Sequence, residues 1–206
     1  MPGGPPAQCY GQDAEGHRLQ FLLGAGTMDT TLKFGGGLDA DLELSSFSLA
    51  GMLPGGERTM FLAGGGVLLD GALNVGGTSD HNFDSGGLAF AGFEHRVGDP
   101  AGGKPSIDLS LRAGFTWGRT SGPGAEQADY RAIDLRGGVK AGWTVAARLF
   151  PYAAGRVFGG PVNWELEGDE VTGSDAHHYQ LAVGAGLAFG PVVMFAEFAG
   201  LGEKAI

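Results

Sequence analysis

The stretch IDLRGGVKAGWTV, residues 133–145, alternates between two kinds of side chain. Every second residue is apolar or small, and those between them are polar, charged or glycine. A period of two indicates an extended strand whose side chains point alternately to opposite faces. The stretch of 13 residues exceeds the usual strand of about five or six. It is long enough to cross the hydrocarbon of a bilayer, which takes a tilted strand of about 9–11 residues.

The same alternation recurs in residues 32–44, 107–117 and 179–189, each of which we predict as one strand. Weaker strand patterns occupy residues 18–27, 47–53, 58–73, 88–97, 149–161 and 192–201. Polar stretches at residues 74–87, 119–129 and 163–176 separate strands and are predicted as long loops. We therefore predict an all-β fold, an antiparallel up-and-down transmembrane β-barrel of 8–10 strands. Its barrel domain spans residues 17–206, after a flexible, Pro/Gly-rich segment at residues 1–16.

Composition favours this class of protein and excludes others. Glycine supplies 41 of 206 residues, far above the usual ~7%. Charged residues make up 17% of the chain and hydrophobic residues 43%. A net charge of −10 argues against nucleic acid as a partner, because no basic patch can meet phosphates. The single cysteine, Cys9, cannot form a disulfide within the chain, and no motif indicates a cofactor.

The polar faces of the predicted strands carry charges of both signs, which we expect to pair inside a narrow lumen. This predicted lumen network consists of Lys33, Asp39, Asp41, Glu43, Asp108, Arg112, Asp134, Arg136, Lys140, Arg156 and Glu197. Glycines on the same faces leave room for such long side chains. Aromatic residues near strand ends are typical of the girdles at bilayer interfaces; the candidates are Phe115, Trp117, Trp143, Tyr152, Trp164, Tyr179 and Phe189. A barrel filled in this way has a closed or very narrow lumen.

On the four alternating stretches 32–44, 107–117, 133–145 and 179–189, the chain resembles the small porin-like outer-membrane β-barrel proteins of Gram-negative bacteria. The resemblance implies that the apolar faces meet lipid and the polar faces line the lumen. It also implies long loops outside, short turns inside and contact with outer-membrane lipid and lipopolysaccharide. The leading hypothesis is a non-enzymatic structural, adhesive or complex-forming component. Its contact surfaces for a protein partner are the predicted loops 74–87 and 163–176.

The chain departs from that family at its C-terminal end. Such barrels usually close with a strand that ends in an aromatic residue, whereas this sequence ends GEKAI and its last aromatic residue is Phe198. If the turn at residues 190–191 is periplasmic, the strand at residues 192–201 runs outward.

Other functions remain open on the sequence. His177 and His178, beside Ser174 and Asp175, resemble the His/Ser pair of outer-membrane lipid A hydrolases, so a lipid-modifying enzyme is one alternative. Small-solute channels and soluble lipocalin-like carriers, with residues 58–73 and 88–97 lining a pocket, are others. Weak metal candidates are the oxygen-bearing residues Asp80, Asn82 and Asp84, spaced like the start of a calcium loop. The acidic residues of 163–176 could bind divalent cations between lipopolysaccharide molecules.

Overall fold

The computed structural model describes residues 20–76, 79–97, 105–122, 127–145, 149–166, 168–189, 192–202 and 204–205. Strands cover nearly all of these residues: β1 (Gln20–Phe34), β2 (Leu38–Pro54), β3 (Thr59–Val75), β4 (Ser79–Arg96), β5 (Ser106–Ser121), β6 (Gln127–Gly142), β7 (Leu149–Gly159), β8 (Pro161–Leu166), β9 (Asp169–Asp175), β10 (Tyr179–Phe189), β11 (Val192–Gly202) and β12 (Lys204–Ala205). In the described residues, no helix has the length and apolar character needed to cross a membrane.

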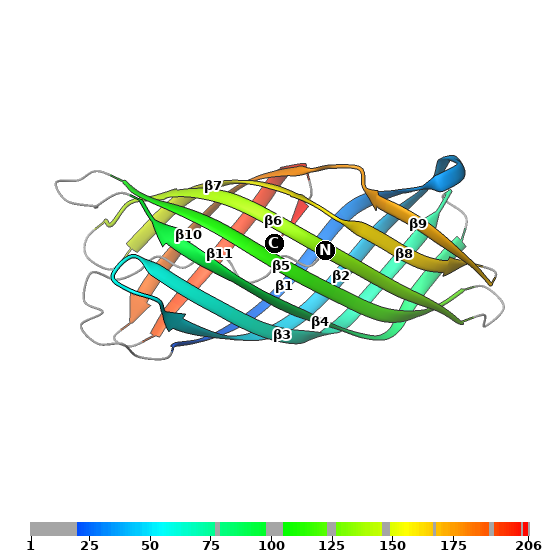
Figure 1. Ribbon diagram of the computed structural model, residues 1–206, viewed down its shortest axis with the longest axis horizontal. Helices are drawn as coiled ribbons and strands as arrows, with labels where there is room; N and C mark the ends of the chain where they lie inside the picture. Colours follow the sequence, from blue (N-terminus) through cyan, green and yellow to red (C-terminus); the bar gives the residue numbers. More distant parts are fainter. Residues whose placement is uncertain are drawn as a thin grey trace.

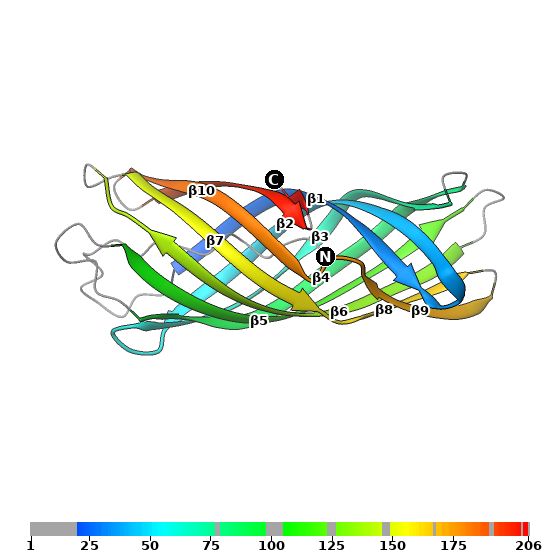
Figure 2. The same cartoon turned by 90° about the horizontal axis from the view of Figure 1, so that it is seen from above.

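These strands form one antiparallel sheet that closes on itself, as Figures 1 and 2 show. One end of the barrel is a ring in which β1 to β6 are followed by β8 and β9, and β9 pairs with β1. Toward the other end, β7 and β10 take the places of β8 and β9, and β11 follows β10. The predicted all-β antiparallel barrel is therefore confirmed.

The two ends of the barrel are easily told apart. We call the end that bears the β8–β9 hairpin and the turn at Gly35–Gly37 the rim. The opposite end, where β1 begins at Gln20 and β2 turns into β3, is the base. The segment predicted as flexible, residues 1–16, lies outside the described residues, as does Cys9.

The predicted single strand at residues 32–44 is wrong, because the chain turns back on itself in its middle. β1 ends at Phe34, a 3-10 turn occupies Gly35–Gly37, and β2 begins at Leu38. Gly36 and Gly37 have φ angles of 79° and 80°, a left-handed conformation that glycine adopts without steric cost. The alternation continues across the turn because Lys33 pairs directly with Asp39, which hid the hairpin from a sequence analysis.

The three long loops predicted from polar composition are also wrong. Most of residues 74–87 belong to β3 and β4, and residues 119–129 belong largely to β5 and β6. Residues 163–176 form most of the β8–β9 hairpin. Each polar stretch extends the barrel wall at the rim, so the connections there are only a few residues long.

Candidate functional site: an apolar belt, a polar collar and a charged lumen

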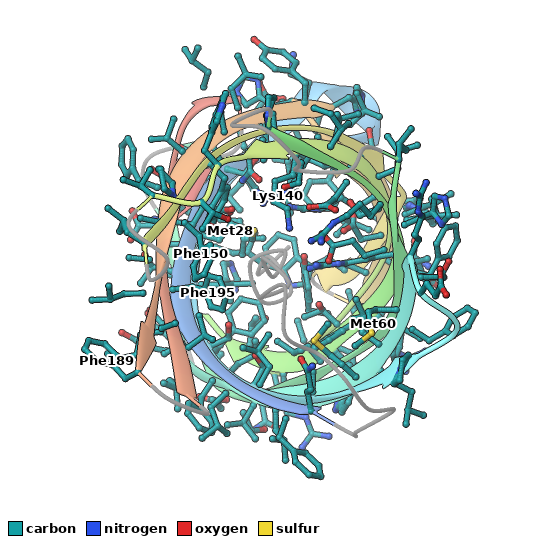
Figure 3. The ribbon with its side chains drawn as sticks, turned by 90° about the vertical axis from the view of Figure 1, so that its left-hand side faces the viewer. Met28, Met60, Lys140, Phe150, Phe189 and Phe195 are labelled. Carbon is teal, nitrogen blue, oxygen red and sulfur yellow. The ribbon has the colours of Figure 1, made fainter. Side chains whose placement is uncertain are left out.

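The outer surface of the base half is an apolar belt. Its large exposed side chains come from β1 to β7, β10 and β11: Phe21, Leu23, Phe47, Leu49, Phe61, Val67, Leu69, Phe93, Leu109, Leu111, Phe115, Ile133, Leu135, Val139, Val157, Leu181, Val183, Phe189, Met194 and Phe198. Leu109, Val139 and Leu181 are 41%, 50% and 50% exposed, which confirms the predicted outward orientation of three of the four alternating stretches. Figure 3 looks along the barrel and shows Phe189 pointing away from it, whereas Phe195 and Lys140 point inward.

Strand β6 shows that both faces reverse their polarity along its length. On the outer face, Asp129 and Arg131 near the rim give way to Ile133 and then Val139 toward the base. On the inner face, the apolar residues Ala128, Tyr130 and Ala132 give way to Asp134, Arg136 and Lys140. The rim half is therefore polar outside and apolar inside, like a soluble β-barrel. The base half is apolar outside and charged inside, as expected of a barrel in lipid.

The outward polar residues of the rim half form a polar collar. It includes Asp29, Thr31, Lys33, Asp39, Asp41, Glu43, Arg119, Gln127, Asp129, Arg131 and Glu165. The prediction that Lys33, Asp39, Asp41 and Glu43 line the lumen is thus wrong. Their neighbours Leu32, Phe34, Ala40, Leu42 and Leu44 fill the interior instead. Alternation separates two faces but does not tell which is inside, and here the more apolar face packs inward.

The other seven predicted network residues lie on the base-half strands, and a chain of ion pairs joins the neighbouring strands β4, β5 and β6 on the inner side of the wall. Lys140 Nζ donates to Glu94 Oε1 at 2.7 Å and lies 3.3 Å from Asp108 Oδ2. Arg96 Nε donates to the other oxygen of Asp108 at 3.1 Å. Lys140, Glu94 and Asp108 are each almost fully buried, so each charge needs the others: a buried charge without a partner is costly.

A second part of the network connects β7, β10 and β11. Arg156 forms a bidentate pair with Glu197, with nitrogen–oxygen distances of 2.7 and 2.6 Å, and it also donates to Gln180 Oε1 at 2.7 Å. Bidentate pairs fix geometry as well as charge.

Arg136 and Arg112 complete the network between these two parts. Arg136 Nε donates to Asp134 at 3.3 Å, and its guanidinium carbon lies 4.4 Å from the centre of the Phe158 ring. Arg112 lies among charges of both signs: Glu94 and Glu197 attract its guanidinium, whereas Arg136 and Arg156 repel it. Within this half, Asp108 and Lys140 belong to one group of ion pairs, Arg156 and Glu197 form a second, and Arg136 pairs with Asp134 on its own strand.

Sequence analysis missed Glu94, Arg96 and Gln180 as members of the lumen network. Glu94 and Arg96 are separated by one residue on β4, and each is directly opposite a residue of β5 in the ladder. The usable signal was the alternation within the predicted strand 88–97, which places Glu94 and Arg96 on the face opposite to Phe93. Gln180 lay on the polar face of residues 179–189 and was overlooked because it carries no charge.

An apolar rim core fills the interior of the rim half. It consists of Met28, Leu32, Phe34, Ala40, Leu42, Leu44, Leu73, Ala128, Tyr130, Ala132, Val162 and Trp164. Trp164 is fully buried, donates from Nε1 to Thr120 Oγ1 at 3.1 Å, and packs edge-on against His81 with ring centroids 4.8 Å apart. Trp164 and Tyr152 were predicted as girdle residues, and both are buried inside the barrel; those two assignments are wrong. Trp143, Tyr179 and Phe189 do lie exposed.

The structure shows the contacts of the His/Ser cluster at residues 174–178. Asp175 points into the barrel, where Thr30 Oγ1 donates to its Oδ1 at 2.9 Å and the backbone nitrogen of His177 donates to the same oxygen at 2.8 Å. His177 and His178 are exposed. Within the described ranges, no hydrogen bond joins either imidazole to Ser174.

The calcium-loop interpretation of residues 80–84 is wrong. Asp80, Asn82 and Asp84 lie in the extended strand β4 rather than in a loop that curls around an ion. Asp84 accepts a hydrogen bond from Ser121. Among the residues whose placement is known, no group of three or more His, Cys, Asp or Glu side chains could hold a metal ion.

Comparisons with known proteins add a structural similarity. No protein-family profile matches the chain, and no curated protein matches it. Among solved structures, the translocator domain of the autotransporter NalP from Neisseria meningitidis is similar, with a TM-score of 0.49 and 16% sequence identity. The match covers 95% of this chain and 88% of that chain. A similarity of this extent carries no functional assignment.

Proposed function

We propose that this protein is an integral outer-membrane β-barrel of a Gram-negative bacterium. It is non-enzymatic and acts as a structural, adhesive or complex-forming component with a sealed lumen. The observation that carries the proposal is the reversal of polarity along the strands, which leaves an apolar belt on the outer surface of the base half. A soluble barrel would leave this belt in contact with water.

The height of the belt fits a bilayer. On β6 and the residue that follows it, the belt runs from Ile133 to Trp143. Ten steps of about 3.4 Å give about 34 Å along the strand. With a tilt of about 40°, this becomes about 26 Å of height, close to the roughly 25 Å apolar band of outer-membrane barrels. Figure 1 shows the strands inclined to the long axis of the barrel.

The interior supports a sealed lumen rather than a channel. The rim core fills the interior of one half, and ion pairs between neighbouring strands line the interior of the other half. A ring of eight strands leaves room mainly for side chains. In addition, Asp175, which neighbours the hydrolase candidates Ser174 and His178, is held by Thr30 and a backbone nitrogen, which supports a structural role for this carboxylate.

We infer that the polar collar faces the outside of the cell and contacts lipopolysaccharide or a protein partner. The segments 74–87 and 163–176 remain the proposed contact surfaces, although most of their described residues lie in strands and not in loops. Lys33, Arg119 and Arg131 of the collar supply cations for anionic lipid headgroups.

Membrane fractionation tests the proposal directly. We expect extraction of the native protein from cell envelopes to require detergent, and we expect the folded protein to migrate faster on gels than the boiled protein. Planar bilayers containing it should carry no steady current, because the rim core blocks the lumen. Release of the protein into a detergent-free supernatant would contradict the bilayer assignment. A steady current would contradict the sealed lumen alone.

A further inference from the structure

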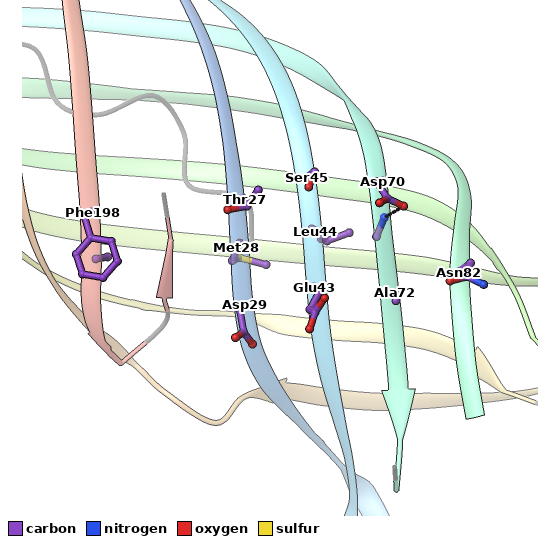
Figure 4. A pocket seen from close by; sticks show the side chains of 12 residues that line it. Thr27, Met28, Asp29, Glu43, Leu44, Ser45, Asp70, Ala72, Asn82 and Phe198 are labelled. Carbon is purple, nitrogen blue, oxygen red and sulfur yellow. Dashed lines mark hydrogen bonds between the residues drawn. The ribbon is translucent and has the colours of Figure 1, made fainter. Parts of the chain in front are cut away.

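The border between the belt and the collar carries opposite charges on two sides of the barrel. On β1 to β3 its outward residues are acidic: Asp29 lies directly opposite Glu43, and Asp70 follows on the next strand. Figure 4 shows these three side chains beside the pocket that they help to line. On β5 and β6 the corresponding outward residues are Arg119 and Arg131. These two arginines are the first outward charges above the apolar belt on their strands.

One carboxylate holds the two arginines side by side. Arg119 Nε lies 3.7 Å from Asp129 Oδ1, and Arg131 Nη2 donates to Asp129 Oδ2 at 3.3 Å. All three side chains are largely exposed. A guanidinium has five N–H donors, so a single contact with Asp129 leaves most donors of each arginine for a further acceptor. The group of three side chains carries one net positive charge.

An aromatic platform lies beside the arginines. Trp117 is directly opposite Arg131 in the ladder between β5 and β6. Its indole covers Gly87 of β4, where an added Cβ atom would come within 2.6 Å of the ring. Phe115 stacks on the indole with ring centroids 5.6 Å apart. Trp117 thus lies against the wall, yet it stays 43% exposed, and tryptophan favours the headgroup level of a membrane.

The height of these side chains fits the junction of acyl chains and headgroups. Arg131 is one outward step above Ile133, the first belt residue of β6. Two residues of a strand span about 6.8 Å, which becomes about 5 Å of height at a tilt of about 40°. A lipid whose acyl chains lie against the belt therefore brings its phosphate to the level of Arg119 and Arg131.

We propose that Arg119, Arg131 and Trp117 bind the phosphate monoester of a lipid in the leaflet around the barrel. This inference rests on the proposed membrane location and names the lipid class and the place of contact on the collar. A phosphate monoester carries a charge of about −1.5 to −2 near neutral pH and has three acceptor oxygens. The planar fork of an arginine binds two such oxygens at once. The acyl chains of the same lipid pack on Phe115, Trp117 and the belt below them.

The acidic side of the border is unsuited to a lipid phosphate. Asp29, Glu43 and Asp70 repel an anion at the same level of the wall. Among the described residues of β1 to β4, Lys33 is the single cation of the collar, and it lies directly opposite Asp39. Lys33 also stands four residues rimward of Asp29, which is about 10 Å higher at the same tilt. The phosphate is therefore expected at β5 and β6 only.

Quenching of tryptophan fluorescence by brominated lipids tests the proposal on the full chain in vesicles. The sequence has three tryptophans, of which Trp164 is buried in the rim core, whereas Trp117 and Trp143 are exposed. The variant Trp143→Phe leaves Trp117 as the exposed reporter and is the parent of all further variants. The vesicles consist of phosphatidylcholine with a minor fraction of phosphatidic acid, and one lipid or the other carries bromine on its acyl chains.

We expect brominated phosphatidic acid to be about fivefold enriched beside Trp117 over its share of the vesicle, because one net positive charge near a lipid surface is worth about this factor. Either Arg119→Gln or Arg131→Gln should lower the enrichment to about one, because it leaves no net positive charge. The matched control is Lys33→Gln, which removes one cation from the other side of the collar and should leave the enrichment unchanged.

Three outcomes would overturn the proposal. The first is an enrichment near one in the parent protein. The second is an equal loss in Lys33→Gln, which would mean that the collar acts through its overall charge. The third is loss of the enrichment when inorganic phosphate is added at the concentration of the phosphatidic acid, because the site would then bind free phosphate. Failure of the membrane location is recognised separately, by the absence of Trp117 quenching in vesicles made wholly of brominated phosphatidylcholine.

Discussion

At the scale of single residues, the ion pair between Arg156 and Glu197 joins two strands that otherwise meet only through β10. Both side chains are mostly buried, at 13% and 15% exposure. The charges face the interior, so neither can be hydrated fully if its partner is removed. The pair therefore contributes more than the exposed ion pairs of the collar do to fixing which strands lie next to each other in the barrel wall.

We expect Arg156→Ala to lower the free energy of unfolding by about 3–5 kcal/mol, because it leaves Glu197 buried without its bidentate partner. Reversible urea unfolding in liposomes measures this loss. Arg131→Ala is the control: its pair with Asp129 lies in the collar and is largely exposed, so the change should be about 0–1 kcal/mol. The double variant Arg156→Met/Glu197→Met should lose less than Arg156→Ala alone. Equal losses for Arg156→Ala and Arg131→Ala would contradict the buried network.

Two glycines of the wall differ in the space around them. A Cβ atom at Gly160 would overlap the backbone carbonyl of Ile133, whereas at Gly137 the nearest atom would be Val157 Cγ2 at 3.9 Å. We expect Gly160→Ala to destabilise the barrel by about 1–3 kcal/mol through forced backbone shifts and Gly137→Ala to change stability little. The temperature at which the folded gel band disappears measures the difference. A Gly160→Ala protein as heat-stable as Gly137→Ala would argue against the close approach of β6 at that point.

At the scale of elements, each long strand passes through two environments, the polar collar near the rim and the apolar belt toward the base. On β6 the outer face changes from Arg131 to Ile133 within two residues, at the border of the collar and the belt. We expect Val139→Arg, in the middle of the belt, to cost about 2–4 kcal/mol, as a charge at the bilayer midplane does. Gln127→Arg, on the same face of the same strand in the collar, should cost close to nothing. Equal effects in liposome unfolding would place both residues in water.

The amino-acid sequence alone predicted correctly only those strand segments whose outer face is apolar. It identified β10 with its observed bounds and most of β5 and β6, because their belt segments alternate cleanly. It missed the rim segments of β3, β4, β8 and β9, because a polar stretch with exposed charges has the composition of a loop. It also placed Asp41 and Glu43 inside, because alternation alone does not distinguish a core from a lipid-facing surface.

The lumen network was predictable to the extent that its members share parity with the alternating stretches. Asp108, Arg136 and Lys140 lie on such stretches, and their inward direction follows from the outward direction of the apolar residues between them. The partners of each charge were not predictable. Which carboxylate lies opposite Lys140 depends on the register between β4, β5 and β6, and long-range register leaves no signal in a single sequence.

At the scale of the whole molecule, the barrel divides into the apolar belt and the polar collar, and in the proposed membrane location the belt contacts lipid while the collar stands above it. This arrangement predicts which sites are reachable from outside an intact cell. In a Cys9→Ser background, we expect Asp41→Cys in the collar to react with a membrane-impermeant maleimide on whole cells. Val139→Cys should not react, because lipid covers it. Glu57→Cys, in the turn between β2 and β3 at the base, should react only after permeabilisation, and the reverse pattern would invert the proposed orientation.

The rim core connects the strands of the rim ring from the inside. Trp164 on β8 contacts Phe34 on β1, with ring centroids 6.0 Å apart, and Phe83 on β4 contacts Tyr130 on β6 at 5.3 Å. We expect Trp164→Ala to lower the free energy of unfolding by about 3–5 kcal/mol, because it leaves a cavity where a fully buried ring had been. Phe189→Ala, on the outer surface at the base, is the control and should lose clearly less. A smaller loss at Trp164 would mean that the rim interior is not packed.

The tight glycine turns at the rim have an immunological consequence. With the wall built from paired strands up to Gly36 and Gly76, an antibody meets residues that are neighbours in space and distant in the sequence. Sera raised against the native protein are therefore expected to recognise conformational epitopes and to lose binding once the antigen is boiled. Linear peptides copied from this region would make poor vaccines, whereas an epitope inserted at Gly36 would be displayed on a rigid support.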